Sequence, residues 1–135
     1  MKTNKFFLLA IILTIAFASC KKYEDGPTIS LSPKKWRVVN VWKTDKTITN
    51  GVSQDGNDDN YIELKKDGKV INSWKIGTAT FSDEGTWKFG DKHETIDVTY
   101  ASQTTEYTIL KLKENEMWVK TEGLGITTET HYISK

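Results

Sequence analysis

The acidic sequence DGNDDN, near the middle of the chain, contains residue types that bind metal ions. Asp55, Asn57 and Asp59 match the spacing of the first three ligands of an EF-hand calcium loop. Asn60 stands where that loop needs glycine, and Lys66 stands where it needs a bidentate glutamate. Because a lysine at the main ligand position repels a cation, we predict an Asx-rich turn here rather than a calcium site.

The histidines and serines indicate no reactive centre. His93 and His131 are the only two histidines, and nothing near either in the sequence completes the three or four ligands that zinc requires. A serine nucleophile on a sharp strand-to-helix turn needs a G-x-S-x-G sequence, which the chain lacks. Acidic residues that are adjacent in the sequence fall in predicted turns, where their carboxylates are expected to be solvated. We therefore predict no metal site, no cofactor and no enzymatic activity.

The residue with the most definite chemistry is Cys20, the only cysteine in the chain. Lys2 and Lys5 precede an apolar run from Phe6 to Ala18, and small residues lead into the cysteine. A basic start, an apolar run and a small-residue end are typical of a secretory signal peptide. The run of 13 residues is shorter than the roughly 20 that cross a bilayer as a helix, so it predicts export rather than a membrane span.

The sequence FASC, which ends at Cys20, resembles the lipobox of bacterial lipoproteins, in which the cysteine is acylated and becomes the mature N-terminus. The resemblance implies a signal peptide at 1–19, a lipidated tether at 20–31 and a folded domain at 32–135, with palmitate on Cys20. Lys21, rather than aspartate, follows the cysteine, which implies the outer membrane, on its periplasmic or its outer side. The alternative is an ordinary signal peptide followed by a cysteine. Acylation is favoured because a lone thiol is a liability in an oxidising compartment.

The composition after residue 19 predicts one nearly neutral domain. The remaining 116 residues hold 17 basic and 18 acidic side chains, for a formal charge of −1. This length suits a single modest core. Near neutrality leaves no basic field to attract nucleic acid. The expected partners are the membrane, through the N-terminal lipid, and either a small apolar ligand or an envelope protein.

The folded domain has the residue pattern of β-strands. Residues 33–38 follow a helix-start signal and are predicted to form one helical turn with Trp36 packed inward. From there on, apolar and polar residues alternate, and turn residues divide the pattern into eight strands. The predicted strands are 37–49, 61–66, 69–76, 84–89, 95–100, 105–112, 116–122 and 127–134, with a polar loop at 50–60 and a turn with a crossover at 77–83.

Short links between successive strands predict an antiparallel meander, and closure of eight strands removes the exposed edges. We therefore predict an all-β fold, an eight-stranded antiparallel up-and-down barrel with a short N-terminal helical turn. Alternation places Trp42 on one face with Asn40 and Thr44, and predicts that Trp118 faces outward. The other predicted interior residues are Ile62, Leu64, Val70, Asn72, Trp74, Trp87, Phe89, Ile96, Val98, Tyr100, Leu110, Leu112, Met117 and Val119.

Several tracts in order resemble the small bacterial lipoproteins with lipocalin-like domains. These tracts are CKKYEDGP from Cys20, SPKKWRVVNVWK from Ser32, GTW at 85–87 and YTILKL at 107–112. The sequence NVW at 40–42 replaces the first G-x-W of that family. The resemblance covers nearly the whole chain and implies a lipocalin-like barrel, but it implies no particular ligand.

Four aromatic residues are the candidate ligand-binding positions of such a barrel: Trp42, Trp74, Trp87 and Tyr100. An eight-stranded barrel is wide enough either to be filled by its own side chains or to hold one small ligand. The sequence therefore leaves two hypotheses. One is a membrane-anchored module that binds a small apolar ligand. The other is an envelope protein-interaction or structural module with a filled barrel.

Overall fold

The computed structural model describes residues 32–135. The predicted signal peptide at 1–19 and the tether at 20–31, which includes Cys20, lie outside the described residues. None of the helices within the described part is long and apolar enough to cross a membrane.

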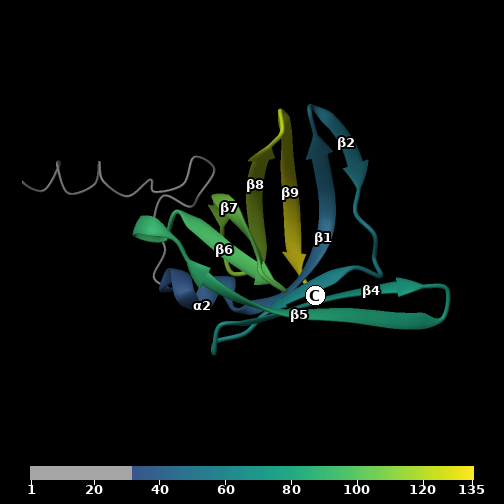
Figure 1. Cartoon of the computed structure of the whole chain (residues 1–135), viewed down its shortest axis with the longest axis horizontal. Helices are drawn as coiled ribbons and strands as arrows, with labels where there is room; N and C mark the ends of the chain where they lie inside the picture. The colour runs from purple at the N-terminus through teal and green to yellow at the C-terminus, as the bar shows by residue number, and fades with distance from the viewer. Residues whose placement is uncertain (1–31) are drawn as a thin grey trace, which may run out of the picture.

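The described chain is almost entirely antiparallel sheet (Figure 1). The helix α2 (Lys34–Val38) precedes the first strand, and the 3-10 turn η1 (Asp91–His93) connects the fifth and sixth. The strands are β1 (Asn40–Thr49), β2 (Val52–Asp55), β3 (Tyr61–Leu64), β4 (Lys69–Ile76), β5 (Ala79–Phe89), β6 (Thr95–Tyr100), β7 (Gln103–Leu112), β8 (Glu116–Gly123) and β9 (Ile126–Ser134).

The sheet closes on itself. Its strand order is β2-β1-β3-β4-β5-β6-β7-β8-β9, and β9 pairs back onto β1. The strands β3 and β2 pair with successive parts of β1, at residues 40–43 and 46–49, while β9 pairs with it at 42–49. Because a strand has only two edges, β2 and β3 share one position, and the barrel has eight. The predicted all-β fold, an eight-stranded antiparallel up-and-down barrel with a short helical turn, is confirmed.

Two predicted connections are wrong because each contains a hairpin. The expected loop at 50–60 includes β2, which returns along β1 through a tight turn in which Asn50 and Gly51 both have positive φ. The expected crossover at 77–83 is mostly strand, since β5 begins at Ala79 and Gly77 supplies the turn with φ 63°. Both turns are short because asparagine and glycine tolerate this backbone conformation.

The core lies inside the barrel, largely as alternation predicts. The buried apolar residues are Val38, Trp42, Leu64, Val70, Trp87, Ile96, Val98, Ile109, Leu112, Met117 and Val119. A register shift between Ile109 and Lys111 buries Ile109 in place of the predicted Leu110. The prediction for Trp36 is also wrong, because its side chain is 68% exposed. The five-residue helix turns Arg37 and Val38 inward instead.

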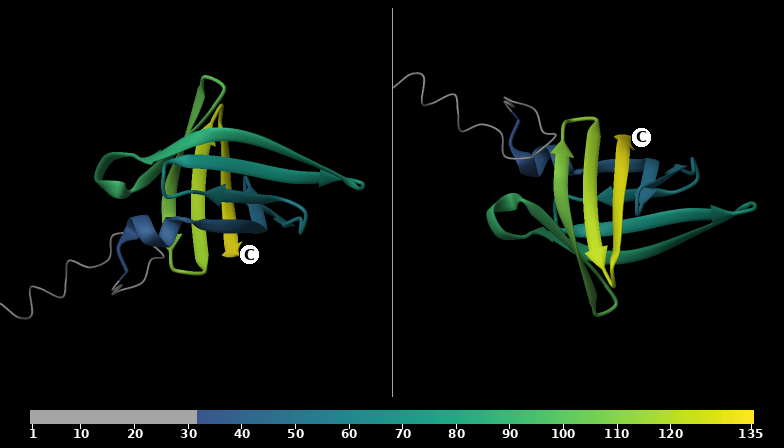
Figure 2. Two further views of the ribbon diagram at one scale, coloured as in Figure 1. Left: turned by 90° about the horizontal axis from the view of Figure 1, so that it is seen from below. Right: turned by 90° about the horizontal axis from the view of Figure 1, so that it is seen from above.

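The two ends of the barrel differ in how completely it is closed. We call the end that carries α2 and the β3–β4, β5–β6 and β7–β8 connections the closed end. The opposite end, at the tips of the β1–β2, β4–β5, β6–β7 and β8–β9 hairpins, is the mouth. The β5–β6 ladder begins at Thr86, and the β7–β8 ladder stops at Thr108. Beyond these points the hairpins separate, and Figure 2 shows the β4–β5 hairpin reaching past the other strands.

The complete closed sheet, its core and α2 all lie within residues 32–135. Within this segment every strand except β2 pairs with at least two others, and β2 pairs with β1. We therefore expect residues 32–135 to fold without the preceding segment.

Candidate functional site

Two of the four predicted ligand-binding aromatics belong to the packed floor of the barrel. Trp42 is fully buried, and its indole N–H donates to the Val38 carbonyl at 2.8 Å. Trp87 is 6% exposed and donates in the same way to the Lys65 carbonyl at 2.8 Å. Both acceptors lie at the closed end. Because a buried N–H needs a partner, these two hydrogen bonds hold the segment that leads into β1 and the β3–β4 turn in place.

Above this floor the barrel interior keeps a small apolar space. Its lining residues are Ile62, Leu64, Ile96, Val98, Tyr107, Met117, Val119 and Tyr132, and its volume is about 20 Å³. This is enough for about one water molecule. This part of the barrel is thus filled by its own side chains.

Three tyrosines mark the transition from the apolar interior to the mouth. Burial raises the pKa of Tyr100 to about 12, with smaller contributions from Tyr107 and Asp83. Burial also raises the pKa of Tyr107, and it raises that of Tyr132, which is affected by the other two rings as well. All three phenols are therefore neutral hydrogen-bond donors near pH 7.

The hydroxyl of Tyr100 is the least satisfied group of this cluster. Its oxygen is buried and has no hydrogen-bond partner within residues 32–135. The ring lies against Gly85, because a Cβ there would be 2.8 Å from Tyr100 Cδ1 and 2.3 Å from the Thr99 carbonyl oxygen. Glycine at position 85 thus leaves room for the ring against β5.

Trp74, the fourth predicted residue, lies nearer the tip of the β4–β5 hairpin. Its ring stacks on Phe81 across the hairpin, with 6.1 Å between centroids. Phe81 is 45% exposed, so this pair forms an apolar wall at the mouth. The four predicted aromatics therefore spread along the barrel axis and do not form one patch.

The structure adds two residues that the sequence analysis missed, Tyr107 and Tyr132. Both face the inside, where Tyr107 is opposite Ile96 and Tyr132 is opposite Met117. Tyr107 is two residues before the buried Ile109, so alternation from Ile109 would have predicted that Tyr107 faces inward. The register shift in β7 breaks this alternation before Leu112, so counting back from Leu112 places Tyr107 on the wrong face. For Tyr132, the polar β9 sequence gave no apolar alternation to follow.

The residues considered for metal binding have other contacts. In the acidic sequence, Asn57 Oδ1 accepts the Asp59 backbone N–H at 2.9 Å, which is the predicted Asx turn. Asp58 pairs with Lys43, and Asp59 pairs with Lys75 at 3.4 Å. No group of three histidine, cysteine or acidic side chains within residues 32–135 could hold a metal ion.

The two histidines contact aromatic rings. His131 stacks on Trp118 with 4.0 Å between centroids and contacts Glu129, on the outer wall of the barrel. Trp118 thus lies on the outer face, as predicted. His93 lies 4.7 Å from Phe89 between centroids.

Comparisons with known proteins bear on the fold. No protein-family model matches the chain, and neither does any curated protein. An uncharacterized protein from Bacteroides eggerthii is 13% identical over 74% of this chain and 99% of its own, with a TM-score of 0.59. Japanin from Rhipicephalus appendiculatus, solved bound to cholesterol, is 9% identical over 76% of this chain and 78% of its own, with a TM-score of 0.47. At such identities, the likeness to the Bacteroides protein supports the barrel fold alone.

Proposed function

We propose that this chain is a lipid-anchored binding protein of the cell envelope whose barrel takes a small, mostly apolar ligand at its mouth. The anchor is Cys20, on the grounds of the preceding signal peptide and the lipobox resemblance. The lysine after it favours the outer membrane. The role is binding rather than catalysis.

The observation that carries the ligand hypothesis is the Tyr100 hydroxyl. Leaving a buried hydroxyl unpaired costs about 1–3 kcal/mol, so such groups in folded proteins usually have a partner. Tyr100 is the last residue of β6, next to the β6–β7 hairpin turn at the mouth. A ligand with a single hydroxyl, carbonyl or carboxylate group would satisfy it while burying its apolar part.

The small interior volume restricts where the ligand would lie. Because the space between the core side chains is only about 20 Å³, a ligand would have to lie above them, between the hairpins that separate at the mouth. There the Trp74–Phe81 pair offers an apolar wall. Concave sites that are mostly apolar and carry a few polar groups are typical of small-molecule binding.

Titration with cis-parinaric acid, a fluorescent fatty acid, tests this site on residues 32–135. We expect saturable binding that Tyr100→Phe weakens by about fivefold, the effect of one hydrogen bond. Tyr61→Phe is the matched control, because Tyr61 lies outside the barrel beneath the Lys135 amine, 3.8 Å from its ring. The hypothesis fails if the probe does not bind, or if both variants bind it equally.

The anchor is tested separately in whole cells. Labelled palmitate should enter the chain, and Cys20→Ala should abolish the labelling. Retention of label in Cys20→Ala would refute the lipoprotein assignment without affecting the ligand hypothesis.

A filled barrel that acts through its outer surface is the second candidate function. The small interior volume favours it, because the lower barrel is already packed. Crosslinking in intact cells should then recover one reproducible envelope partner, whether or not the barrel binds the fatty acid.

A further inference from the structure

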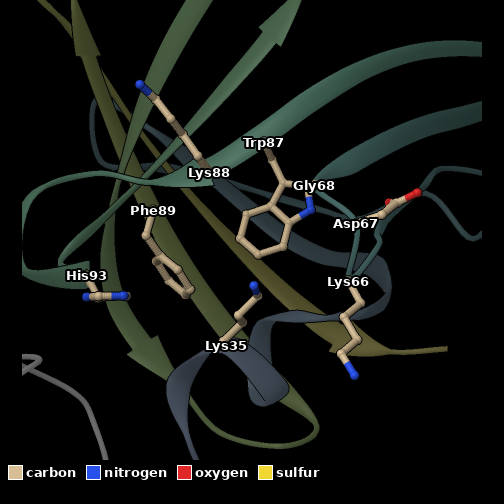
Figure 3. Close-up of a pocket in the computed structure, with 8 residues that line it drawn as sticks. All are labelled: Lys35, Lys66, Asp67, Gly68, Trp87, Lys88, Phe89 and His93. Carbon is tan, nitrogen blue, oxygen red and sulfur yellow. The ribbon is translucent and has the colours of Figure 1, made fainter.

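The closed end carries a pocket that the ligand hypothesis does not use. It has a volume of about 320 Å³ and lies between α2, the β3–β4 turn and the end of β5 (Figure 3). Three lysines line it, Lys35, Lys66 and Lys88, with Asp67 as the one acid. The rings of Trp87 and Phe89 form its wall, and Figure 3 shows the Lys35 amine pointing toward them.

A second pocket adjoins the first and is mostly apolar. It has a volume of about 250 Å³, is lined by Trp36 and Val39, and shares Lys35 and Lys66 with the first. The Lys66 amine lies 5.0 Å from the centre of the Trp36 ring. An exposed indole is thus flanked by two exposed cations. We call Lys35, Trp36 and Lys66 the basic face.

The closed end and the mouth lie on opposite sides of the molecule. The views agree that α2 lies on the side of the molecule away from the tip of the β4–β5 hairpin (Figures 1 and 2). A contact made through the basic face therefore leaves the mouth uncovered.

We propose that the basic face docks on anionic phospholipid headgroups at the membrane surface, with Trp36 at headgroup depth and Lys35 and Lys66 on phosphates. Tryptophan is enriched at membrane interfaces because its ring is apolar and its N–H is polar. Lysines close to an anionic surface each strengthen binding by about fivefold.

The basic face lies close in the sequence to the proposed anchor, which supports the membrane surface as its binding partner. The proposed anchor at Cys20 precedes α2 by 13 residues, which span at most about 45 Å when fully extended. This part of the argument rests on the proposed function. Docking at the closed end would leave the mouth directed away from the membrane surface and open to its ligand.

Co-sedimentation of residues 32–135 with vesicles tests the docking without the lipid anchor. We expect binding to vesicles that contain phosphatidylglycerol, little binding to pure phosphatidylcholine, and a decrease with added salt. The double variant Lys35→Glu/Lys66→Glu should lose at least tenfold in affinity. Lys75→Glu is the charge control, because Lys75 lies on the β4–β5 hairpin near the mouth.

Fluorescence locates the contact. Brominated phosphatidylglycerol should quench part of the tryptophan emission, and Trp36→Phe should remove that part while the other four tryptophans stay unquenched. Equal vesicle binding by the wild type and the double variant would overturn the proposal. So would equally tight binding of soluble glycerol 1-phosphate, which would assign the pocket to a free phosphate. Neither result affects the palmitate or the fatty-acid experiment.

Discussion

The closed end and the mouth are built from the same strands but differ in packing and polar contacts. At the closed end, Trp42 and Trp87 are buried, and both indole N–H groups have carbonyl partners. At the mouth, Trp74 stacks on a half-exposed ring, and the buried hydroxyl of Tyr100 lacks a partner in the described chain. The difference indicates that one end stabilises the fold, while the other leaves polar and apolar surface for binding.

Strand pairing follows the same division. Residues 79–85 of β5 and 103–107 of β7 each pair on one edge only, because the β5–β6 and β7–β8 ladders do not extend to the mouth. Strand ends with one neighbour open at lower free energy than the core. The mouth can therefore adjust to a ligand while the closed end stays intact.

Trp42→Ala is expected to give the largest loss of stability. Removing a fully buried indole leaves a cavity and an unpaired Val38 carbonyl, so we expect a loss of about 3–5 kcal/mol in the free energy of unfolding. Trp74→Ala should cost only about 1–2 kcal/mol, because that ring is half-buried. Urea unfolding of both variants measures the difference. Equal losses would show that the two ends are equally packed.

Many of the interior positions of the barrel could be predicted from the sequence. Alternation predicted the interior positions of β6 and β8, because the residues beside Ile96, Val98, Met117 and Val119 are polar except for Trp118. The Trp87 position followed from the same rule. Local patterns succeed here because one buried face determines the register.

Predictions from the sequence were wrong or missing where contacts between distant segments decide which side chains are buried. Nothing local distinguishes Trp36, which is exposed, from Arg37, which is buried and donates to the Leu112 carbonyl 75 residues away. The tyrosine cluster likewise depends on the meeting of β6, β7 and β9. Apolar periodicity cannot show which tyrosines share a space, because such a cluster arises only when the barrel closes.

Gly85→Ala tests the packing of the Tyr100 ring against Gly85. A Cβ at this position would overlap the Thr99 carbonyl oxygen and the Tyr100 ring, so the strand or the ring must move. We expect a loss of about 1–3 kcal/mol in the free energy of unfolding, together with weaker fatty-acid binding. Gly123→Ala is the matched control, because a Cβ there meets nothing within 4 Å. If both variants unfold at the same urea concentration, the Tyr100 ring does not rest on Gly85.

The pH dependence of stability tests the burial of Tyr100. Because burial raises its pKa from 10.0 to about 12, the unfolded chain loses this proton before the folded chain does. The stabilisation is present below pH 10 and is lost as the pH rises toward 12. Tyr100→Phe should therefore make the decline in stability over this interval shallower. Urea unfolding between pH 9 and 12 measures it, and an unchanged slope would contradict the burial of the hydroxyl.

The smallest effect concerns an ion pair at the closed end. Burial by itself would raise the pKa of Glu116, but the hydrogen bonds and charges of Lys111 and Lys113 outweigh it and hold the pKa below its ordinary 4.5. The pair therefore stabilises the fold above pH 4.5, and this contribution is lost as the pH falls through the lowered value. Lys111 also lies 3.7 Å from the Trp118 ring centre and is the less exposed of the two lysines.

Lys111→Met should accordingly cost about 0.5–1.5 kcal/mol at pH 7 and should flatten the acid-side decline in stability. Lys113→Met should change both quantities less, because the Lys113 side chain is 45% exposed and solvent screens its charge. Thermal unfolding between pH 3 and 7 compares the two variants. If Lys113→Met had the larger effect, the more exposed Lys113 rather than Lys111 would control the pKa of Glu116. The closed end would then owe less of its stability to polar contacts than the tryptophan hydrogen bonds suggest.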